Sequence, residues 1–371
     1  MIIPLIKPEV GREEAKAASD VILTTWINEG RSVQAFEQSI ARYTMTEHAV
    51  AFFNGTVALN ALLAAMGIGP GDEVIVPSFT FFSTVSTVVH LGARPVFADV
   101  SLENFGLDPA DVEKRITSRT RAIIVVHYGG CPADMDGIPA VAHRHGIPLI
   151  EDAAEALGSS YRNKPVGGFG KAAMFSFTPT KVITTGEGGI LTTHDGELAS
   201  RLRLLKNHGQ ERLYHHVLFG FNYRMTEMQG AIGLAQMAKL NGIIENKRRV
   251  AEKISERLSD IQAIRLPLFK PEYFCTYMLY TIIVPTKEMR EDLAAELERQ
   301  DITTRVYFPP VHQQPVFSAN GRPRLPVTEK LGETSLTLPC YASMTDDEIT
   351  YMTDCIKTYF GKRNENYSHP A

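Results

Sequence analysis

The sequence over residues 121–152 reads RAIIVVHYGGCPADMDGIPAVAHRHGIPLIED. Its two ends, Arg121–His127 and Pro148–Asp152, are short apolar runs of the kind that form buried strands. The stretch Ile138–His145 between them reads as a helix. A strand, a helix and a second strand in this order predict a right-handed crossover between two parallel strands.

The same alternation continues on both sides of this unit. Strands are expected at residues 49–53, 73–76, 95–98, 172–177 and 189–193, and helices at 56–66, 84–91 and 109–116. Together with the two strands above, they predict an α/β fold with a mostly parallel seven-stranded sheet flanked by helices. In such folds, ligands bind beyond the carboxyl ends of the strands.

A second, smaller unit is expected after Arg224, where the pattern changes. Residues 226–258 predict a long helix, 277–284 a strand, 290–300 a charged amphipathic helix and 346–359 a C-terminal helix. At about 100–200 residues per domain, a chain of 371 residues suggests two domains. We place a large domain with an N-terminal arm at residues 1–244 and a smaller α/β domain at 245–371.

The composition argues against several classes of protein. Lys and Arg number 38 and Asp and Glu number 42, so the net charge is −4, which does not favour a nucleic-acid partner. No apolar run approaches the roughly 18 residues of a membrane span, and no secretory signal is evident, so a cytoplasmic protein is expected. The four cysteines form no CxxC pair, and neither HExxH nor zinc spacing occurs, so reduced thiols and no metal site are expected.

Three segments that follow predicted strands carry residues suited to a single ligand. Asn54-Gly55-Thr56 opens a helix, whose free N–H groups and dipole attract an anion such as a phosphate. In Glu151-Asp152, strand alternation points the carboxylates to opposite faces, so one can enter a site while the other pairs or caps. Lys181 lies in a turn between two strands, beside the glycine-rich residues 186–189. Taken singly, these features also fit a plain turn, a helix N-cap and a surface lysine.

Together, the three segments describe pyridoxal 5′-phosphate. The helix terminus at Gly55 and Thr56 suits the phosphate, and a partly desolvated Lys181 can form a Schiff base with the aldehyde. Asp152 suits the protonated pyridine nitrogen, and a proton held there makes the ring an electron sink. The sequence therefore predicts a site for this cofactor.

The chain resembles the sugar-nucleotide aminotransferases of the DegT/DnrJ/EryC1/StrS family, which have the fold type I of aspartate aminotransferase. The resemblance runs from Ile3 to about Phe360, nearly the whole chain. It rests on Asn54-Gly55-Thr56, Pro77–Phe81, Val126–Gly130, Glu151–Ala154, the Lys181 segment and Gly220–Glu227.

The resemblance implies roles for the matching residues. Lys181 would be the Schiff-base lysine that also moves the proton, and Asp152 would pair with the ring nitrogen. Phe81 would stack on the ring, although core packing would also explain it, and Glu155 would approach the ring hydroxyl. Phosphate contacts are implied for Gly55, Thr56 and Ser176.

The resemblance also implies a homodimer whose active sites are shared across the interface. Asn222 would reach the phosphate of the cofactor in the neighbouring subunit, and Arg224 is a second candidate for the same contact. Arg224 is also a candidate contact for the substrate.

The reaction implied by the resemblance is the transfer of an amino group from L-glutamate to a nucleotide-linked keto sugar. Family members that dehydrate their substrate carry His where this chain has Lys181, which favours amino transfer here. Many relatives carry His at the position of Thr178, a departure that affects substrate contacts but not the Schiff base. Glu155 and residues 301–315 resemble the members that make GDP-perosamine, which favours C4 of a 4-keto-6-deoxyhexose.

Several questions stay open at this point. Arg305, Tyr307 and His312 are candidate substrate contacts, but residues 301–315 are also consistent with a loop that only packs on the large domain. Transfer to C3 of a 3-keto sugar nucleotide and a non-catalytic regulator that binds the same ligands are the alternatives. The residues do not distinguish GDP, UDP and dTDP, nor the pathway, for which polysaccharide biosynthesis is one candidate.

Overall fold

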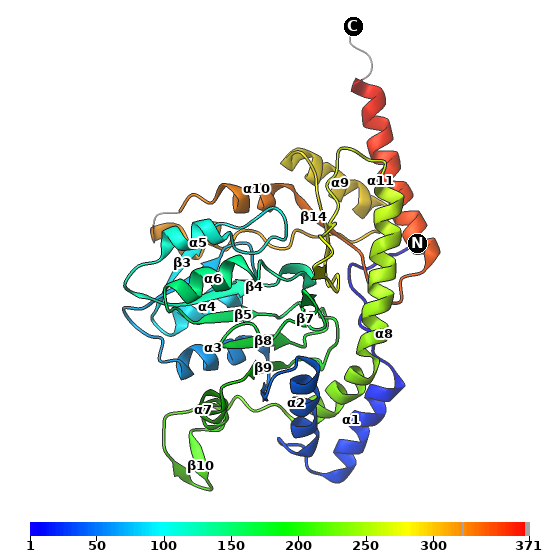
Figure 1. The fold of residues 1–371 in the computed structure, drawn as a ribbon. Helices are drawn as coiled ribbons and strands as arrows, with labels where there is room; N and C mark the ends of the chain where they lie inside the picture. The colour runs from blue at the N-terminus through cyan, green and yellow to red at the C-terminus, as the bar shows by residue number, and fades with distance from the viewer. Residues whose placement is uncertain (321–322, 368–371) are drawn as a thin grey trace.

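The computed structural model describes residues 1–320 and 323–367. A seven-stranded sheet lies at its centre (Figure 1), with the strand order β1-β9-β8-β5-β4-β2-β3. In chain order the strands are β1 (His48–Phe52), β2 (Glu73–Pro77), β3 (Arg94–Ala98), β4 (Thr120–Val126), β5 (Leu149–Asp152), β8 (Ala172–Ser176) and β9 (Gly189–Thr193). β9 runs antiparallel to its neighbours β1 and β8, and the other pairs are parallel. The expected α/β fold class, with a mostly parallel sheet of seven strands, is confirmed.

Helices cover both faces of this sheet. Val74 and Val76 of β2 pack on the face covered by α3 (Gly55–Ala65), α4 (Phe82–His90) and α7 (Gly196–Lys206). Ile75 between them packs on the opposite face, which is covered by α5 (Pro109–Arg115) and α6 (Gly137–Arg144). On that side, α2 (Arg31–Tyr43) and the first half of α8 (Glu227–Leu258) cover β1, β8 and β9. Strands buried on both faces read as continuous apolar runs, which is why the sequence located them.

Capping side chains explain where several helices begin. The N-cap Asn54 of α3 accepts a hydrogen bond from Val57 N at 3.0 Å. α8 begins after Thr226, whose Oγ1 accepts from Gln229 N (3.3 Å) while Gln229 Oε1 accepts from Thr226 N (2.8 Å). Thr286 caps α9 (Lys287–Arg299), so this helix begins before the predicted residue 290.

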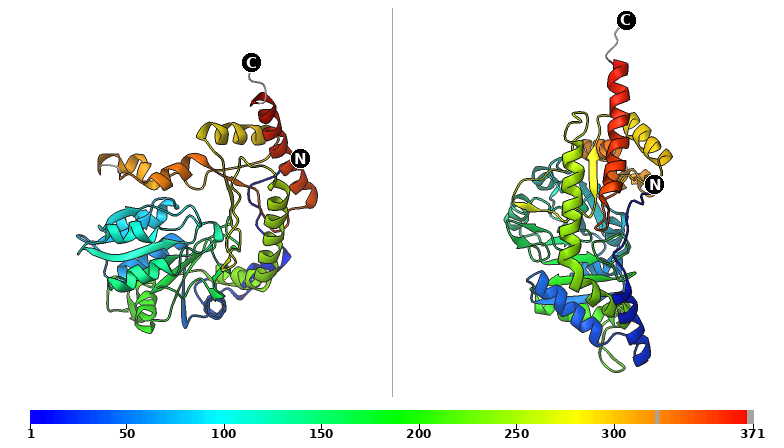
Figure 2. Two further views of the ribbon diagram at one scale, coloured as in Figure 1. Left: turned by 45° about the horizontal axis from the view of Figure 1, so that its top comes forward. Right: turned by 90° about the vertical axis from the view of Figure 1, so that its right-hand side faces the viewer.

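The C-terminal elements form a second apolar core. β13 (Tyr280–Ile283) and β14 (Ser335–Leu338) pair antiparallel and pack with α9, α11 (Asp346–Tyr367) and the second half of α8. α8 and α11 run side by side along one flank of the molecule (Figure 2). Ile3 from the N-terminus is buried in this core and pairs with Ile302. α8 runs unbroken through the expected boundary at residues 244 and 245, so the division there stays a prediction.

Other elements were not expected from the sequence. They are α1 (Arg12–Thr24), α2, α7, α10 (Pro326–Thr334), β6 (Ser160–Tyr161), β7 (Lys164–Pro165), β10 (Gln210–Arg212), β11 (His215–His216), β12 (Tyr273–Phe274), β14 and the 3₁₀ turns η1 (Tyr128–Gly130), η2 (Val311–Gln313) and η3 (Pro315–Asn320). The strand expected at 277–284 is confined to β13, because Thr276 N and Leu279 N donate to the loop carbonyls of Gly130 and Gly129. α11 continues past its predicted end at residue 359 to Tyr367. The four cysteines are free thiols, as expected.

No helix within residues 1–320 and 323–367 combines the length and the apolar character needed to cross a bilayer.

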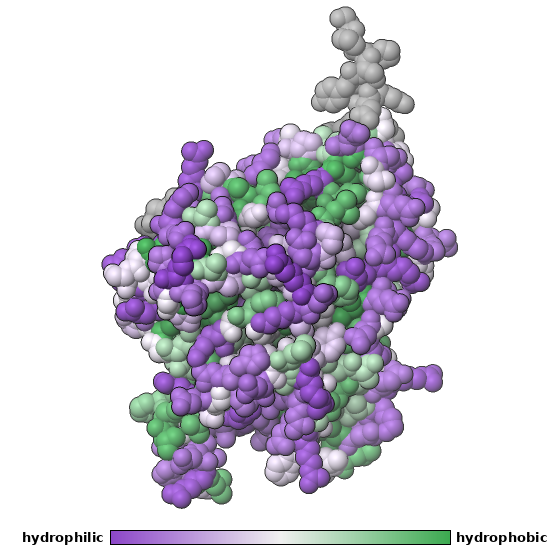
Figure 3. Space-filling view, in the orientation of Figure 1, coloured by the Kyte–Doolittle hydropathy of each residue, from purple (hydrophilic) through white to green (hydrophobic). Residues whose placement is uncertain are grey.

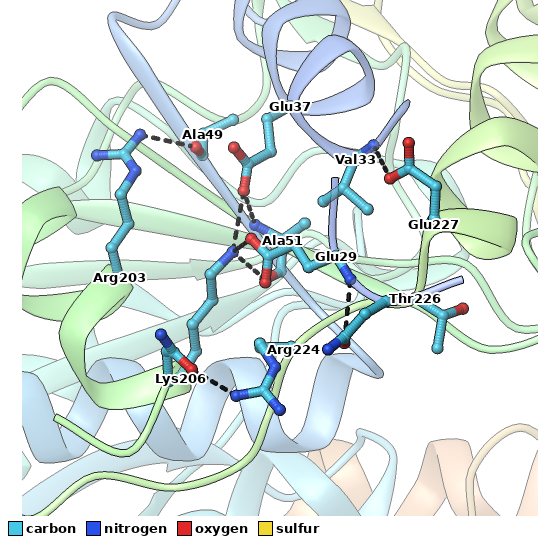
Figure 4. A network of polar contacts seen from close by, with 12 residues as sticks. Glu29, Val33, Glu37, Ala49, Ala51, Arg203, Lys206, Arg224, Thr226 and Glu227 are labelled. Atoms are coloured by element: carbon cyan, nitrogen blue, oxygen red, sulfur yellow. Dashed lines mark hydrogen bonds and ion pairs between the residues drawn. The ribbon is translucent and has the colours of Figure 1, made fainter. Parts of the chain in front are cut away.

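Glu227 of α8 also caps a second helix, α2. Substituting it therefore tests whether this contact stabilises the N-terminal helices. Its buried carboxylate accepts from Ser32 N (2.6 Å) and Val33 N (3.3 Å) in the first turn of α2 (Figure 4). We expect Glu227→Ala to lower the free energy of unfolding by about 1–2 kcal/mol, because α2 loses the acceptor of two N–H groups. Urea or thermal unfolding measures this change. Glu256→Ala, on an exposed position of α8, is the control and should cost less than about 0.5 kcal/mol; equal losses would contradict the assignment.

Candidate active site

The carboxyl ends of the parallel strands meet at one edge of the sheet. Because β9 is antiparallel to both β1 and β8, β1 points the same way as the other five strands, and only β9 begins at this edge. The segments that follow β1, β2, β4, β5 and β8 are therefore brought together there. Three of them are the segments that the sequence marked for a ligand.

Lys181 lies in the turn between β8 and β9, and its side chain is largely buried. The turn is closed by a hydrogen bond from Lys181 N to Thr178 O at 3.0 Å. Lys181 Nζ forms an ion pair with Glu155 Oε1 at 3.3 Å. The other oxygen of Glu155 accepts from Gly129 N, after β4, at 2.8 Å. An amine and a carboxylate from different loops thus meet at the edge, and a third loop fixes the carboxylate.

Asp152 ends β5 beside this pair. Its Oδ2 accepts from Thr84 Oγ1 (2.7 Å) and its Oδ1 from Ala154 N (3.2 Å). Burial raises the pKa of Asp152, and the bonds from Thr84 and Ala154 and the charge of Lys181 only partly offset this rise. The residues after β5 form turns rather than a helix, so the alternative that Asp152 is a helix N-cap is wrong.

Phe81 is joined to Asp152 through one helical turn. It is the N-cap residue of α4, it is exposed, and its carbonyl accepts from Thr84 N at 3.2 Å. Thr84 in turn donates to Asp152, so its hydroxyl accepts from Thr80 Oγ1 at 2.9 Å. The Phe81 ring is exposed rather than packed in the core, and its centroid lies 5.8 Å from that of Phe308.

Gly55, Thr56 and Ser176 form a second cluster on the same edge. A Cβ placed on Gly55 would lie 3.1 Å from Ser176 Cβ, so the two residues are neighbours. Gly55 and Thr56 are in the first turn of α3, where N–H groups have no acceptor inside the helix. Gly189 packs so closely that a Cβ on it would lie 2.5 Å from Asn54 O. Free N–H groups, hydroxyls and glycines in this arrangement suit an anion.

Asn222 and Arg224 lie on a surface segment beside this second cluster. Asn222 is exposed and pairs through its backbone with Asn207, and Arg224 Nη1 donates to Asn207 Oδ1. Tyr223 O accepts from Phe53 N at 3.1 Å, next to the N-cap of α3. No ion pair or hydrogen bond found in the described residues joins Asn222 to Lys181 or Asp152.

A buried lysine holds this segment in place (Figure 4). Lys206 Nζ bonds to Glu29 Oε1 (2.6 Å), Glu37 Oε1 (3.2 Å) and Ala51 O (3.1 Å), which satisfies its three N–H groups. Lys206 O accepts from Tyr223 N at 2.9 Å. The ion pairs therefore tie the N-terminal region, the edge strand β1 and the Asn222 segment together.

The late segment around Tyr307 reaches the Lys181 cluster. Tyr307 O accepts a hydrogen bond from the hydroxyl of Tyr128, the residue that directly precedes Gly129. Burial raises the pKa of Tyr307; the nearby Arg305 works against this rise, and the negative charge of Glu155 adds to it. Arg305 itself is exposed and pairs through its backbone with Thr337.

His312 lies in a different setting from Tyr307. It is buried, with Nδ1 2.7 Å from Ser78 Oγ and Nε2 3.4 Å from Glu329 Oε1. Its backbone N also donates to Ser78 Oγ at 2.9 Å. These contacts anchor the late segment on the loop after β2, which is the packing role that the sequence left open.

Sequence reasoning missed Thr84 and Gly129 as parts of the site. Thr84 lies three residues after Phe81, a spacing that places both on one side of α4 once the start of that helix is known. Gly129 acts through its backbone N–H, which the sequence does not reveal. Within residues 1–320 and 323–367, no group of three or more His, Cys, Asp or Glu side chains could hold a metal ion.

Comparisons with known proteins agree with this arrangement. The model of the DegT/DnrJ/EryC1/StrS aminotransferase family matches residues 8–357. The chain is 36% identical over 364 residues to GDP-perosamine synthase of Escherichia coli O157:H7, covering 97% of this chain and 99% of that protein. It is 38% identical over 332 residues to UDP-N-acetyl-3-dehydro-alpha-D-glucosamine 3-aminotransferase of Acidithiobacillus ferrooxidans, covering 89% of this chain and 88% of that protein.

Solved structures are also similar over the full length. The PLP form of the putative sugar aminotransferase Spr1654 from Streptococcus pneumoniae superposes with a TM-score of 0.94 at 26% identity. The match covers 98% of this chain and 99% of that chain.

The close approach of Gly189 to the start of α3 is open to a direct test. We expect Gly189→Ala to lower the free energy of unfolding by about 1–3 kcal/mol, because the added methyl meets the backbone of Asn54 and Gly55. Chemical unfolding measures this loss. Gly242→Ala, inside α8 with nothing within 4 Å of the new Cβ, is the control and should instead stabilise by about 0.5–1 kcal/mol. A Gly189→Ala protein as stable as the parent would contradict the packing.

Proposed function

Because the chain belongs to the DegT/DnrJ/EryC1/StrS aminotransferase family, and is therefore a sugar-nucleotide aminotransferase, we propose that it moves the amino group of L-glutamate to C4 of a nucleotide-linked 4-keto-6-deoxyhexose with the help of pyridoxal 5′-phosphate. The observation that carries this proposal is the ion pair of Lys181 and Glu155, 3.3 Å long, beside the buried carboxyl of Asp152.

The residues present fit this cofactor. The first turn of α3 at Gly55 and Thr56, with Ser176 against it, would hold the phosphate. Asp152 is buried with a raised pKa and short of positive charge, which is what the protonated ring nitrogen would supply. Phe81, exposed one helical turn before Thr84, would lie on the face of the ring. When bound, the cofactor supplies an electron sink for the reacting carbon.

The chain's own groups divide the remaining work. Lys181 Nζ is the base that removes the proton from Cα of L-glutamate and the acid that returns a proton to the sugar carbon. Glu155, fixed by Gly129 N, orients this amine. Asp152 keeps the proton on the ring nitrogen, and Thr84 orients the carboxylate that does so. Tyr307 and Arg305 would face the sugar nucleotide at the mouth of the site.

Two positions on the sugar remain candidates, and each has its own support. Glu155 and residues 301–315 favour C4, and a relative named GDP-perosamine synthase covers nearly the whole chain. Transfer to C3 is the second candidate, because a relative of comparable identity is named as a 3-aminotransferase. We favour C4, with the nucleotide left to the experiment below.

We also propose that the active unit is a homodimer in which Asn222 reaches the phosphate site of the partner. Asn222 is exposed, and no hydrogen bond of its side chain is found within the described residues. The hairpin of β10 and β11 beside it projects from the body (Figure 1) and carries the exposed apolar residues Leu213 and Tyr214 in its turn, and the exposed Phe219 follows it in the chain. In Figure 3, apolar side chains gather above the projecting end of this hairpin, and the end itself is mostly hydrophilic. Exposed apolar clusters of this kind mark protein interfaces.

The proposed reaction predicts a specific product. With L-glutamate and a nucleotide-linked 4-keto-6-deoxyhexose, offered with GDP, UDP or dTDP, we expect 2-oxoglutarate and a sugar that carries nitrogen on C4, identified by NMR of the product. Lys181→Ala should lose at least about 10³-fold in rate, since it removes the proton-transferring amine. Amination of a 3-keto sugar nucleotide alone would contradict the C4 proposal, and full activity of Lys181→Ala would contradict the role of the lysine.

The shared site predicts complementation between two inactive variants. Lys181→Ala and Asn222→Ala proteins, unfolded and refolded together, would form mixed dimers in which one site has both Lys181 and the partner's Asn222. We expect the mixture to recover activity well above the sum of the separate proteins. Mixed dimers no more active than that sum would place Asn222 in the site of its own chain.

A further inference from the structure

A second pair of titratable residues lies behind the site and has no role in the reaction above. His127 directly follows β4, and Glu151 directly precedes Asp152 in β5. Both side chains are fully buried, with His127 Nε2 3.1 Å from Glu151 Oε2. Strand alternation turns Glu151 away from the face of Asp152, so the pair does not touch the substrate region.

Glu151 is held by four donors. Its Oε1 accepts from Phe169 N (2.8 Å) and Gly170 N (2.9 Å), and its Oε2 accepts from Gly167 N (3.0 Å) and from His127. Burial alone would raise the pKa of Glu151, but the hydrogen bonds from His127 and the backbone outweigh it and lower the pKa. The carboxylate therefore stays ionised and supplies a fixed acceptor.

The hydrogen bonds also set the tautomer of His127. Ala133 N donates to His127 Nδ1 at 3.0 Å, so Nδ1 is an acceptor and the ring proton sits on Nε2, facing Glu151. The ring is thus clamped on both nitrogens. The hydrogen bond from Ala133 N to the ring closes a loop over residues 127–133, and this loop contains the turn formed by Tyr128–Gly130.

This turn carries the N–H group that holds Glu155. Gly129 and Gly130 have φ values of 62° and 83°, the left-handed region that favours glycine. In this conformation Gly129 N points at Glu155 Oε2 (2.8 Å), and Glu155 Oε1 pairs with Lys181 Nζ. Glu151 is thus connected to Lys181 in three steps: a hydrogen bond to His127, two residues of backbone from His127 to Gly129, and the contacts of Gly129 N and Lys181 Nζ with Glu155.

We propose that His127 and Glu151 are positioning residues for the amino-transfer reaction: the pair fixes the turn at Gly129 and thereby aims Glu155 at Lys181. This inference rests on the proposed function. The backbone N–H of His127 also donates to Asp152 O at 3.1 Å. His127 is therefore connected to Asp152 directly and to Glu155 through the turn at Gly129, and these are the two carboxylates that would contact the cofactor. The pair is placed between β4 and β5, whose relative position the parallel ladder fixes.

A double-mutant cycle on the affinity for pyridoxal 5′-phosphate tests the route through Glu155. His127→Asn keeps an acceptor for Ala133 N but is too short to reach Glu151, whereas His127→Gln can extend a donor toward Glu151. We expect His127→Asn to raise the Kd of the full-length protein about tenfold and His127→Gln to raise it less. In a Glu155→Ala background, His127→Asn should change the Kd by less than about twofold, because neighbours in one network are not additive.

Two results would overturn the proposal. One is an equal loss of affinity from His127→Asn in both backgrounds, which would mean that the residue acts on general stability. The other is no loss in either background. Thermal unfolding of each variant distinguishes a loss of overall stability from a loss of the orientation of Glu155 toward Lys181.

A second measurement needs no cofactor and keeps the two proposals distinguishable. In the cofactor-free protein, hydrogen exchange of the peptide that contains Gly129 and Gly130 should accelerate about tenfold or more in His127→Asn, and less in His127→Gln. Unchanged protection would overturn the positioning role. If the parent protein bound no pyridoxal phosphate, the proposed function would fail while this exchange result still decided the role of the pair.

Discussion

Buried charges at the carboxyl edge of the sheet constrain the rest of the structure. Glu151, Asp152 and Glu155 are buried, and Lys181 is largely buried beside them. An unpaired charge in such a setting costs several kcal/mol, so each one requires a donor or a counter-charge at a fixed distance. The donors come from separate loops, Gly129 after β4, Thr84 in α4 and the turn at residues 167–170. The site therefore forms only if the fold holds these three segments at fixed positions relative to one another.

The parallel sheet meets this requirement, and the reversed strand β9 adds to it. Because β9 starts where the other strands end, Lys181 lies in the twelve-residue connection 177–188 between two paired strands instead of at the end of a crossover helix. Hydrogen bonds to Phe177 O from Thr185 N (3.0 Å) and Thr184 Oγ1 (2.9 Å) fold this connection back on itself and limit the positions that the lysine can take. The C-terminal elements contribute from the other side, since Thr276 and Leu279 bond to the glycine turn and Tyr307 to Tyr128. The central sheet and the C-terminal elements therefore both contact the turn at Tyr128–Gly130.

The central sheet and much of the site could be predicted from the sequence, for physical reasons. Strands buried on both faces appear as apolar runs, and the residues after them carry the chemistry, so Lys181, Asp152 and Gly55 could be identified together. The sequence did not reveal α1 and α2, whose positions depend on distant partners such as Glu227, nor Thr84 and Gly129, which act through tertiary contacts. The expected boundary after residue 244 falls inside α8, because a helix that serves two cores shows no break in its pattern.

The absorbance spectrum of the purified protein, recorded before and after addition of L-glutamate, tests the central claim most directly. A yellow band from the cofactor joined to Lys181, which bleaches on addition of L-glutamate to the pyridoxamine form, is the predicted result. It would establish the cofactor, the lysine and the amino donor in one experiment. A protein that shows no such band after reconstitution with pyridoxal 5′-phosphate would contradict the claim, and a band indifferent to L-glutamate would contradict the assignment of the donor.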